Sequence, residues 1–137
     1  MASWRLCDTA ATLDLALSAL IKADVIFLDC EGKDLGEVGG RLSLISLGAV
    51  REIPSSGGQT HLDVFLIDAI ALATNNNDDG RSGGGGLLEP IYELLRRETV
   101  LKVGYDLRMD VAEFWHGHGV KIENVLDLQV ADILARQ

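Results

Sequence analysis

The stretch that decides the fold of this chain is Val25-Ile26-Phe27-Leu28-Asp29-Cys30-Glu31-Gly32. Its leading apolar residues are typical of a buried strand, and two carboxylates follow where we expect that strand to end. Because successive side chains of a strand point to opposite faces, Asp29 and Glu31 should share one face while Cys30 points to the other. Carboxylates at the edge of an apolar core repel each other and lose hydration, so they need a shared proton, an Arg or Lys, or a divalent cation such as Mg²⁺.

Length and composition are those of one soluble globular domain. The chain has 137 residues, of which 47% are hydrophobic and 24% charged, enough to bury a core. No apolar run approaches the roughly 20 residues of a membrane span, and the first residues lack the order of a signal peptide. Cys7 and Cys30 are too few for a disulfide framework. We therefore expect an intracellular protein, in cytoplasm or nucleus, with no membrane partner.

The net charge of −9 argues against a protein that holds nucleic acid by bulk electrostatics alone. It does not exclude a nuclease, because cations loaded into an acidic site offset its repulsion of phosphate. Local Lys or Arg side chains can still guide a strand.

The segments around the opening stretch predict an α/β sheet. We expect strands at 24–29, 41–49, 61–68, 100–104 and 121–126. Helices are expected from a cap at Asp8 or Thr9 to residue 22, and at 87–98, 106–116 and 128–135. The first two strands should form an antiparallel pair with a long loop, and two helix-to-strand crossovers complete a five-stranded mixed sheet flanked by helices. Residues 75–86 contain no apolar side chain and predict a flexible insertion, with no Lys-Ser or Lys-Thr of a phosphate loop after the glycines.

A third carboxylate interrupts the apolar stripe of the helix expected at 106–116. Residues at spacings of three and four share one face of a helix, and here they are Leu107, Asp110, Val111 and Phe114. A buried Asp without a partner would be costly or protonated. Two interpretations follow: Asp110 is a third ligand beside Asp29 and Glu31, or it lies at the edge of the stripe, solvated or paired with Arg108 or Lys102.

Other polar residues of this region have simpler interpretations. Asp106 follows a predicted strand and Asp127 precedes the last predicted helix, so both are expected to cap helices. The segment His116-Gly117-His118 is similar to a metal-binding pair, but its place after a helix favours a C-terminal turn.

Three segments of the chain resemble the ribonuclease D-like branch of the DEDD 3′–5′ exonucleases. An apolar strand ending in Asp-x-Glu is matched by Phe27-Leu28-Asp29-Cys30-Glu31. A strand, a turn and a helix with an Asp are matched by Lys102-Val103-Gly104-Tyr105-Asp106-Leu107-Arg108-Met109-Asp110. A strand ending in Asp-Thr-Gln is similar to Val120-Lys121-Ile122-Glu123-Asn124-Val125-Leu126-Asp127-Leu128-Gln129. The last two segments also resemble animal relatives of the Egalitarian type, some of which bind RNA or partners rather than degrade RNA.

The resemblance implies a ribonuclease H-like fold and hydrolysis with two Mg²⁺ or Mn²⁺ ions. Asp29 would bridge both ions, Glu31 would bind one and help to position the water, and Asp110 would complete the second site. The implied substrates are the 3′ ends of single-stranded RNA or DNA. Lys33 and Arg41, beside the loop after the first strand, are candidate phosphate contacts, and are equally explained as solvated loop charges.

The chain departs from the family pattern at its last motif. That motif is a fourth carboxylate, with a Tyr or His four residues before it, on a later helix, and the sequence reaches Gln137 without one. Tyr92, Tyr105, His116 and His118 come too early to replace it. We expect the N-terminal portion of an exonuclease domain, incomplete at its C-terminus: either a truncated enzyme, active or inactive in this form, or a non-catalytic module that binds nucleic acid or a protein. A third interpretation is an unrelated α/β domain whose carboxylates are ordinary caps and surface charges.

Overall fold

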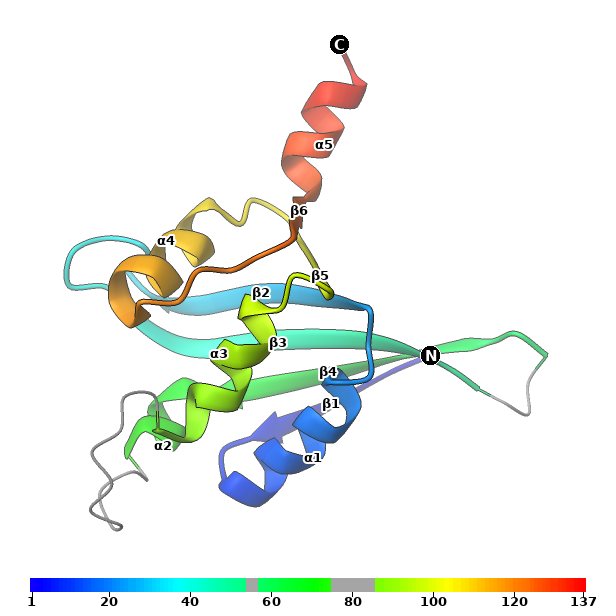
Figure 1. The fold of residues 1–137 in the computed structure, drawn as a ribbon, viewed down its shortest axis with the longest axis horizontal. Helices are drawn as coiled ribbons and strands as arrows, with labels where there is room; N and C mark the ends of the chain where they lie inside the picture. The colour runs from blue at the N-terminus through cyan, green and yellow to red at the C-terminus, as the bar shows by residue number, and fades with distance from the viewer. Residues whose placement is uncertain (54–56, 75–85) are drawn as a thin grey trace.

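A computed structural model describes residues 1–53, 57–74 and 86–137 of the chain. The insertion predicted at 75–86 therefore lies outside the described residues, apart from its last position. The described strands form one six-stranded sheet in the order β1-β4-β3-β2-β5-β6 (Figure 1). The mixed α/β architecture is as expected, but the count of five strands was wrong.

The strand missed by the sequence pattern is β1 (Ala2–Cys7), which pairs in parallel with β4 (Thr60–Asp68) at the edge of the sheet. Only Cys7 is buried in it, because an edge strand with one neighbour leaves most of its side chains in solvent. Its sequence therefore lacks the apolar alternation that identifies a strand.

The central strands follow the expected pairing. Antiparallel neighbours β2 (Val25–Lys33) and β3 (Arg41–Glu52) are confirmed, and β3 also pairs antiparallel with β4. The short strands β5 (Leu101–Gly104) and β6 (Val125–Asp127) add in parallel beside β2. The expected end of the first strand near Asp29 was wrong, because the ladder with β3 continues through a register shift between Glu31 and Gly32 to Lys33.

The helices described are α1 (Ala10–Leu20), α2 (Ala69–Thr74), α3 (Glu89–Arg96), α4 (Arg108–His118) and α5 (Leu128–Ala135), with a 3₁₀ turn η2 (Gly86–Leu88). Thr9 caps α1 as expected, and its hydroxyl accepts a hydrogen bond from the Thr12 N–H. The short α2 was not predicted. None of the helices in the described part of the chain is long and apolar enough to cross a membrane.

The core lies on one face of the sheet. Ile26, Leu28 and Cys30 of β2 point into it, where they meet apolar side chains of three helices: Leu13, Ala16 and Leu20 of α1; Ile91, Leu94 and Leu95 of α3; Leu107 and Phe114 of α4. On the opposite face, Val25 and Phe27 remain 40% exposed. The alternation of β2 thus separates a covered face from an open face.

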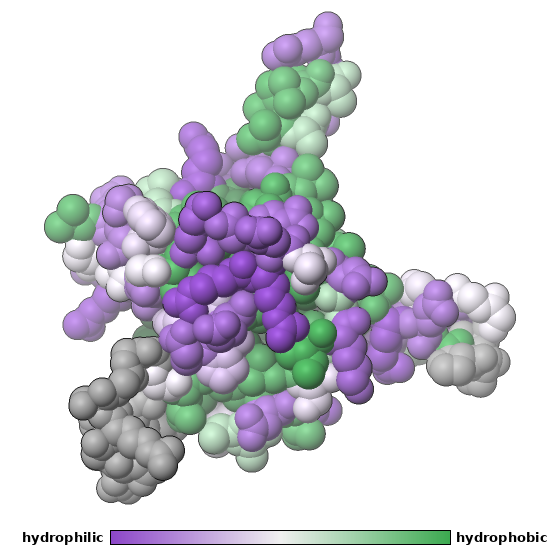
Figure 2. Space-filling model, viewed as in Figure 1, coloured by the Kyte–Doolittle hydropathy of each residue, from purple (hydrophilic) through white to green (hydrophobic). Residues whose placement is uncertain are grey.

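Helix α5 projects from the body of the domain (Figure 1) and has no buried residue. Its apolar side chains lie on the surface in Figure 2 and are Leu128, Val130, Ile133 and Leu134.

Candidate metal and nucleic-acid site

The strand β2 presents Asp29 and Glu31 on the open face of the sheet. Burial alternates along the strand, so that both carboxylates are exposed while Cys30 between them is 7% exposed. Their partners on β3 are Ser46 and Leu44. The predicted common face of Asp29 and Glu31 is therefore confirmed.

The third predicted carboxylate, Asp110, lies in the first turn of α4 on the face that packs into the core. It is 7% exposed, between Leu107 at 2% and Phe114 at 0%, so the predicted inward stripe is confirmed. Within the described ranges, the Oδ1 atom of Asp110 is buried without a hydrogen-bond partner. Such a group is costly in a folded protein unless a ligand or an ion satisfies it.

The alternative partners for Asp110 are engaged elsewhere. The Nε of Arg108 lies 2.8 Å from an oxygen of Asp106. The buried ammonium of Lys102 donates to the backbone carbonyls of Arg97 at 2.6 Å and Val100 at 2.9 Å. The interpretation of Asp110 as a solvated or ion-paired edge residue is therefore wrong.

Asp110, Cys30 and Asp29 form an electrostatically coupled group at the junction of α4 and β2. Burial raises the pKa of Asp110; a side-chain hydrogen bond with Cys30 lowers that pKa in part, and the negative charge of Asp29 raises it again. Burial also raises the pKa of the Cys30 thiol, and the carboxylate of Asp110 adds to this rise. The raised pKa keeps Cys30 a neutral thiol rather than a nucleophilic thiolate.

These residues fit a divalent cation in the type of donor that they offer. Oxygen ligands suit Mg²⁺ or Mn²⁺, and the unpaired Oδ1 of Asp110 is an acceptor in need of a partner. In the described part of the chain, however, no three His, Cys, Asp or Glu side chains converge closely enough to hold an ion. Asp110 lies against Cys30 on the covered side of β2, whereas Asp29 and Glu31 lie on its open side.

Asp127 connects β6 to the start of α4. As predicted, it caps α5, since its carboxylate accepts the Gln129 N–H at 2.9 Å. It also accepts the N–H groups of Asp106 at 3.0 Å and Leu107 at 2.8 Å. Burial favours the neutral acid, but these backbone hydrogen bonds outweigh it and hold the pKa of Asp127 below its usual value.

The expectation that Asp106 caps α4 was wrong. The N-cap position is Leu107, which makes no side-chain cap hydrogen bond. Asp106 adopts a left-handed backbone conformation with φ of 55°, and its carboxylate faces Arg108 instead. Asp127, a residue too distant in sequence to be read from local spacing, instead accepts the N–H groups of Asp106 and Leu107 just before the helix begins.

Lys33 and Arg41 lie opposite each other where β2 and β3 join the loop of residues 34–40. Both side chains are exposed. Exposure is compatible with a contact to phosphate and with contact to solvent alone.

Sequence reasoning missed a buried carboxylate, Glu113, which is 4% exposed. Its spacing of three from Asp110 on α4 was the available signal. The His116–His118 pair is not a metal pair: His118 lies at the end of α4, its Nδ1 is 3.0 Å from the Tyr92 hydroxyl and its Nε2 is 3.6 Å from Glu113. The predicted C-terminal position of this segment is confirmed by the end of α4 and the left-handed Gly119 after it.

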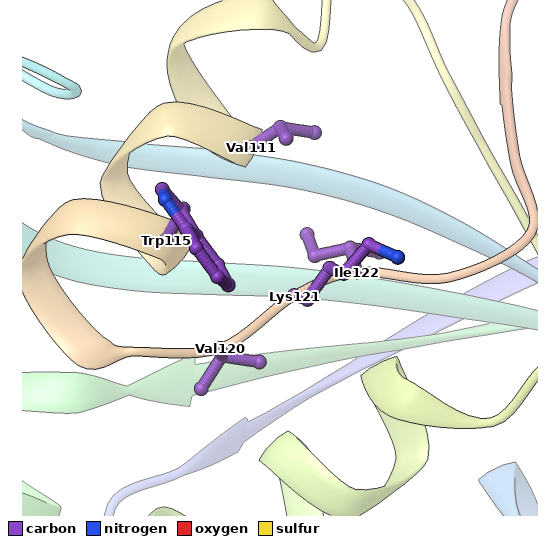
Figure 3. Close-up of a pocket in the computed structure, with 5 residues that line it drawn as sticks. All are labelled: Val111, Trp115, Val120, Lys121 and Ile122. Atoms are coloured by element: carbon purple, nitrogen blue, oxygen red, sulfur yellow. The ribbon is translucent and has the colours of Figure 1, made fainter.

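An apolar pocket of about 240 Å³ lies between α4 and the segment that leads to β6 (Figure 3). It is lined by Val111 and Trp115 of the helix and by Val120, Lys121 and Ile122 of the segment that leads to β6. No carboxylate lines it, so it does not belong to the acidic group on β2.

The sheet order and the flanking helices define a mixed α/β domain with carboxylates on β2 and α4. The family described as 3′–5′ exonuclease matches residues 4–136, and the chain belongs to this family. None of the curated protein sequences matches the chain.

Solved structures agree with this assignment. RNase D of Trypanosoma brucei in complex with GMP is 28% identical, with a TM-score of 0.70, over 94% of this chain and 34% of that one; the same RNase D has been solved with RNA U12. The EXD2 exonuclease domain soaked in Mg and GMP is 20% identical with a TM-score of 0.66, over 97% of this chain and 59% of that one. The Aedes aegypti Nibbler EXO domain is 19% identical with a TM-score of 0.67, over 98% and 56% of the two chains.

The resemblance to ribonuclease D-like DEDD exonucleases and the ribonuclease H-like fold are thereby confirmed. The chain spans about a third of the RNase D chain that it matches.

Proposed function

We propose that this chain is the nuclease portion of a divalent-cation-dependent enzyme that removes nucleotides from the 3′ ends of single-stranded RNA or DNA. Asp29, Glu31 and Asp110 are the residues that we assign to catalysis and to cation binding. Lys33 and Arg41 are the proposed contacts to substrate phosphates. Membership of the 3′–5′ exonuclease family supports the reaction type.

The observation that carries the proposal is the unpaired Oδ1 of Asp110. A carboxylate that is 7% exposed, lacks a partner for one oxygen and is repelled by Asp29 destabilises the fold in which it lies. A bound cation would compensate both the missing partner and the repulsion. A purely structural Asp at this position has no such compensation.

The chemistry is a hydrolysis of the terminal phosphodiester. The oxygen of a water forms a bond to phosphorus and the bond from phosphorus to the 3′ oxygen of the preceding nucleotide breaks. One proton of the water ends on that 3′ oxygen, and a nucleoside 5′-monophosphate is released. Divalent cations supply charge neutralisation, a more acidic water and stabilisation of the leaving oxygen. In this chain, the exposed Asp29 and Glu31 would supply cation ligands from β2, and the buried Asp110 would supply a further carboxylate from α4.

Cation binding is tested by calorimetric titration of Mn²⁺ into the wild type, Asp29→Ala and a matched control, Asp14→Ala. Asp14 is an exposed acidic residue on α1. We expect the Asp29 variant to bind Mn²⁺ at least about tenfold more weakly, as loss of a ligand or of its support commonly does. Equal binding by all three proteins would refute the assignment.

Exonuclease activity is tested with 5′-labelled single-stranded RNA and DNA of the same sequence in Mg²⁺. We expect products that shorten progressively from the 3′ end, inhibition by EDTA, and protection of strands whose 3′ hydroxyl is blocked. Glu31→Gln should abolish the shortening while leaving the fold intact, since Glu31 is exposed.

A second candidate function is a non-catalytic module that binds nucleic acid or a protein. It is favoured by the lack of three converging ligands in the described ranges. This candidate predicts that the wild type binds a single-stranded oligonucleotide without shortening it, in Mg²⁺ or in Mn²⁺. Progressive shortening that Asp29→Ala abolishes would eliminate it.

A further inference from the structure

Glu113 is a buried charged group that the proposed reaction does not use. It is 4% exposed. Because Asp110 precedes it by three residues on α4, the two carboxylates lie on the same side of the helix. A buried carboxylate remains stable only when it is hydrogen-bonded or paired. The partners of Glu113 therefore indicate what the residue holds in place.

Those partners come from two different elements. The Oε2 of Glu113 accepts the backbone N–H of Gly36, in the loop between β2 and β3, at 2.9 Å. Its Oε1 lies 3.6 Å from the Nε2 of His118, whose Nδ1 is 3.0 Å from the Tyr92 hydroxyl on α3. Gly117 leaves room for this arrangement, because a Cβ there would lie 2.9 Å from the Oε1 of Glu113.

The loop packs its backbone directly against α4 at Gly36. This residue has a φ of +76°, and a Cβ on it would lie 2.9 Å from the backbone oxygen of Met109 and 3.0 Å from the Cβ of Ala112. A hydrogen bond within the loop, from the Glu37 N–H to the Asp34 carbonyl at 3.1 Å, braces the turn. In Figure 1 this loop curls beside α4. The loop is thus docked on α4 at Gly36, both by a hydrogen bond and by close packing of the backbone.

We propose that Glu113 is a positioning residue that docks residues 34–40 on α4 and so sets where a nucleic-acid strand meets the acidic residues. This inference rests on the proposed function. The docked loop is flanked by Lys33, two residues after Glu31 on β2, and by Arg41 on β3, while α4 carries Asp110. One carboxylate therefore fixes the proposed phosphate contacts relative to the proposed cation ligands.

The test compares Glu113→Ala, Gly36→Ala and the double variant in the complete chain. Hydrogen exchange of the amide at position 36 reports docking, and the Kd for a single-stranded oligonucleotide in Mg²⁺ reports strand binding. We expect Glu113→Ala to accelerate that exchange about tenfold and to raise KM and Kd with little change in kcat. Glu113→Gln retains an acceptor for the Gly36 N–H and should restore most of both properties. Glu93→Ala, an exposed glutamate variant, is the matched control.

The effects of substituting Glu113 and Gly36 should not be additive. Because Glu113→Ala and Gly36→Ala break the same contact from opposite sides, the double variant should be no worse than the worse single variant. Gly36→Ala leaves the buried carboxylate in place, so it tests the docking even where Glu113→Ala fails to fold. Additive effects, or a released loop with unchanged oligonucleotide affinity, would overturn the inference. A wild type that neither binds nor shortens oligonucleotides would instead refute the proposed function, and the strand placement with it.

Discussion

Asp110→Asn should make the cation-free protein more stable while it removes cation binding. The native carboxylate is 7% exposed, has one oxygen without a partner and is repelled by Asp29. An unsatisfied buried polar group costs about 1–3 kcal/mol. Asn removes the charge but keeps a polar amide at the same place, so we expect a gain near the lower end, about 1 kcal/mol in the free energy of unfolding.

The sign of this effect with pH follows from the raised pKa of Asp110. The folded state holds the proton more tightly than the unfolded state does, so the native protein loses stability as the pH rises from the unfolded pKa to the folded pKa. Above that window the full penalty is present, and below it the penalty is absent. The advantage of Asp110→Asn should therefore be largest at neutral pH and shrink in acid.

Urea unfolding with and without Mn²⁺ measures both parts of the prediction. In EDTA the variant should unfold at higher urea than the wild type. A ligand at 100 times its Kd stabilises the folded state by about 2.7 kcal/mol. Mn²⁺ at that ratio should therefore raise the free energy of unfolding of the wild type and not that of the variant. Asp14→Asn, on the exposed face of α1, should behave as the wild type does. A variant that is clearly destabilised in EDTA, or that gains as much from Mn²⁺ as the wild type, would refute the reasoning.

Three further predictions concern groups outside the acidic site. Lys102→Met should lower the free energy of unfolding by about 1–3 kcal/mol, because its fully buried ammonium donates to two backbone carbonyls; Lys121→Met, on the surface, should leave the urea midpoint unchanged. Asp127→Ala should lower the Tm by releasing three backbone N–H groups; since the pKa of Asp127 is lowered, its stabilisation is lost as the pH falls through that value, and the Tm difference should narrow in acid. Arg51→Gln should raise the pKa of Asp63 toward its ordinary value in an NMR titration, because hydrogen bonds from Arg51 and a serine now outweigh burial; an unchanged pKa would show that the ion pair does not form.

Most elements that bury an apolar face were predictable from the sequence, although the short α2, which buries Ala69 and Leu72, was not. A run of four apolar residues identified β2, and the spacing of three and four residues placed Asp110 on the buried face of α4. Edge strand β1 escaped prediction, since it has no buried stripe to display. A segment whose apolar residues follow no regular spacing carries little information about which strand it pairs with.

The site was predictable only in its chain-local parts. That Asp29 and Glu31 share a face follows from strand geometry alone. The role of Asp127 at the start of α4 depends on contacts with residues 20 or more positions away. Likewise, the hydrogen bond between Glu113 and Gly36 joins residues 77 positions apart, and neither residue type predicts it. Long-range hydrogen bonds of this kind are determined by the packing of α4 on the sheet, which local periodicity does not encode.

The alternation of β2 also determines which substitutions affect both the fold and the site. Side chains that stabilise the core, such as Leu28, point to the covered face, while Asp29 and Glu31 point to the open one. Changes on the open face should therefore alter cation binding and leave stability nearly untouched. Asp110 is different, because α4 supplies it from within the core. Of the three assigned carboxylates, we therefore expect only Asp110 to destabilise the fold while it contributes to cation binding. If its replacement raises the free energy of unfolding and weakens Mn²⁺ binding, Asp110 is the cation ligand that destabilises the cation-free protein.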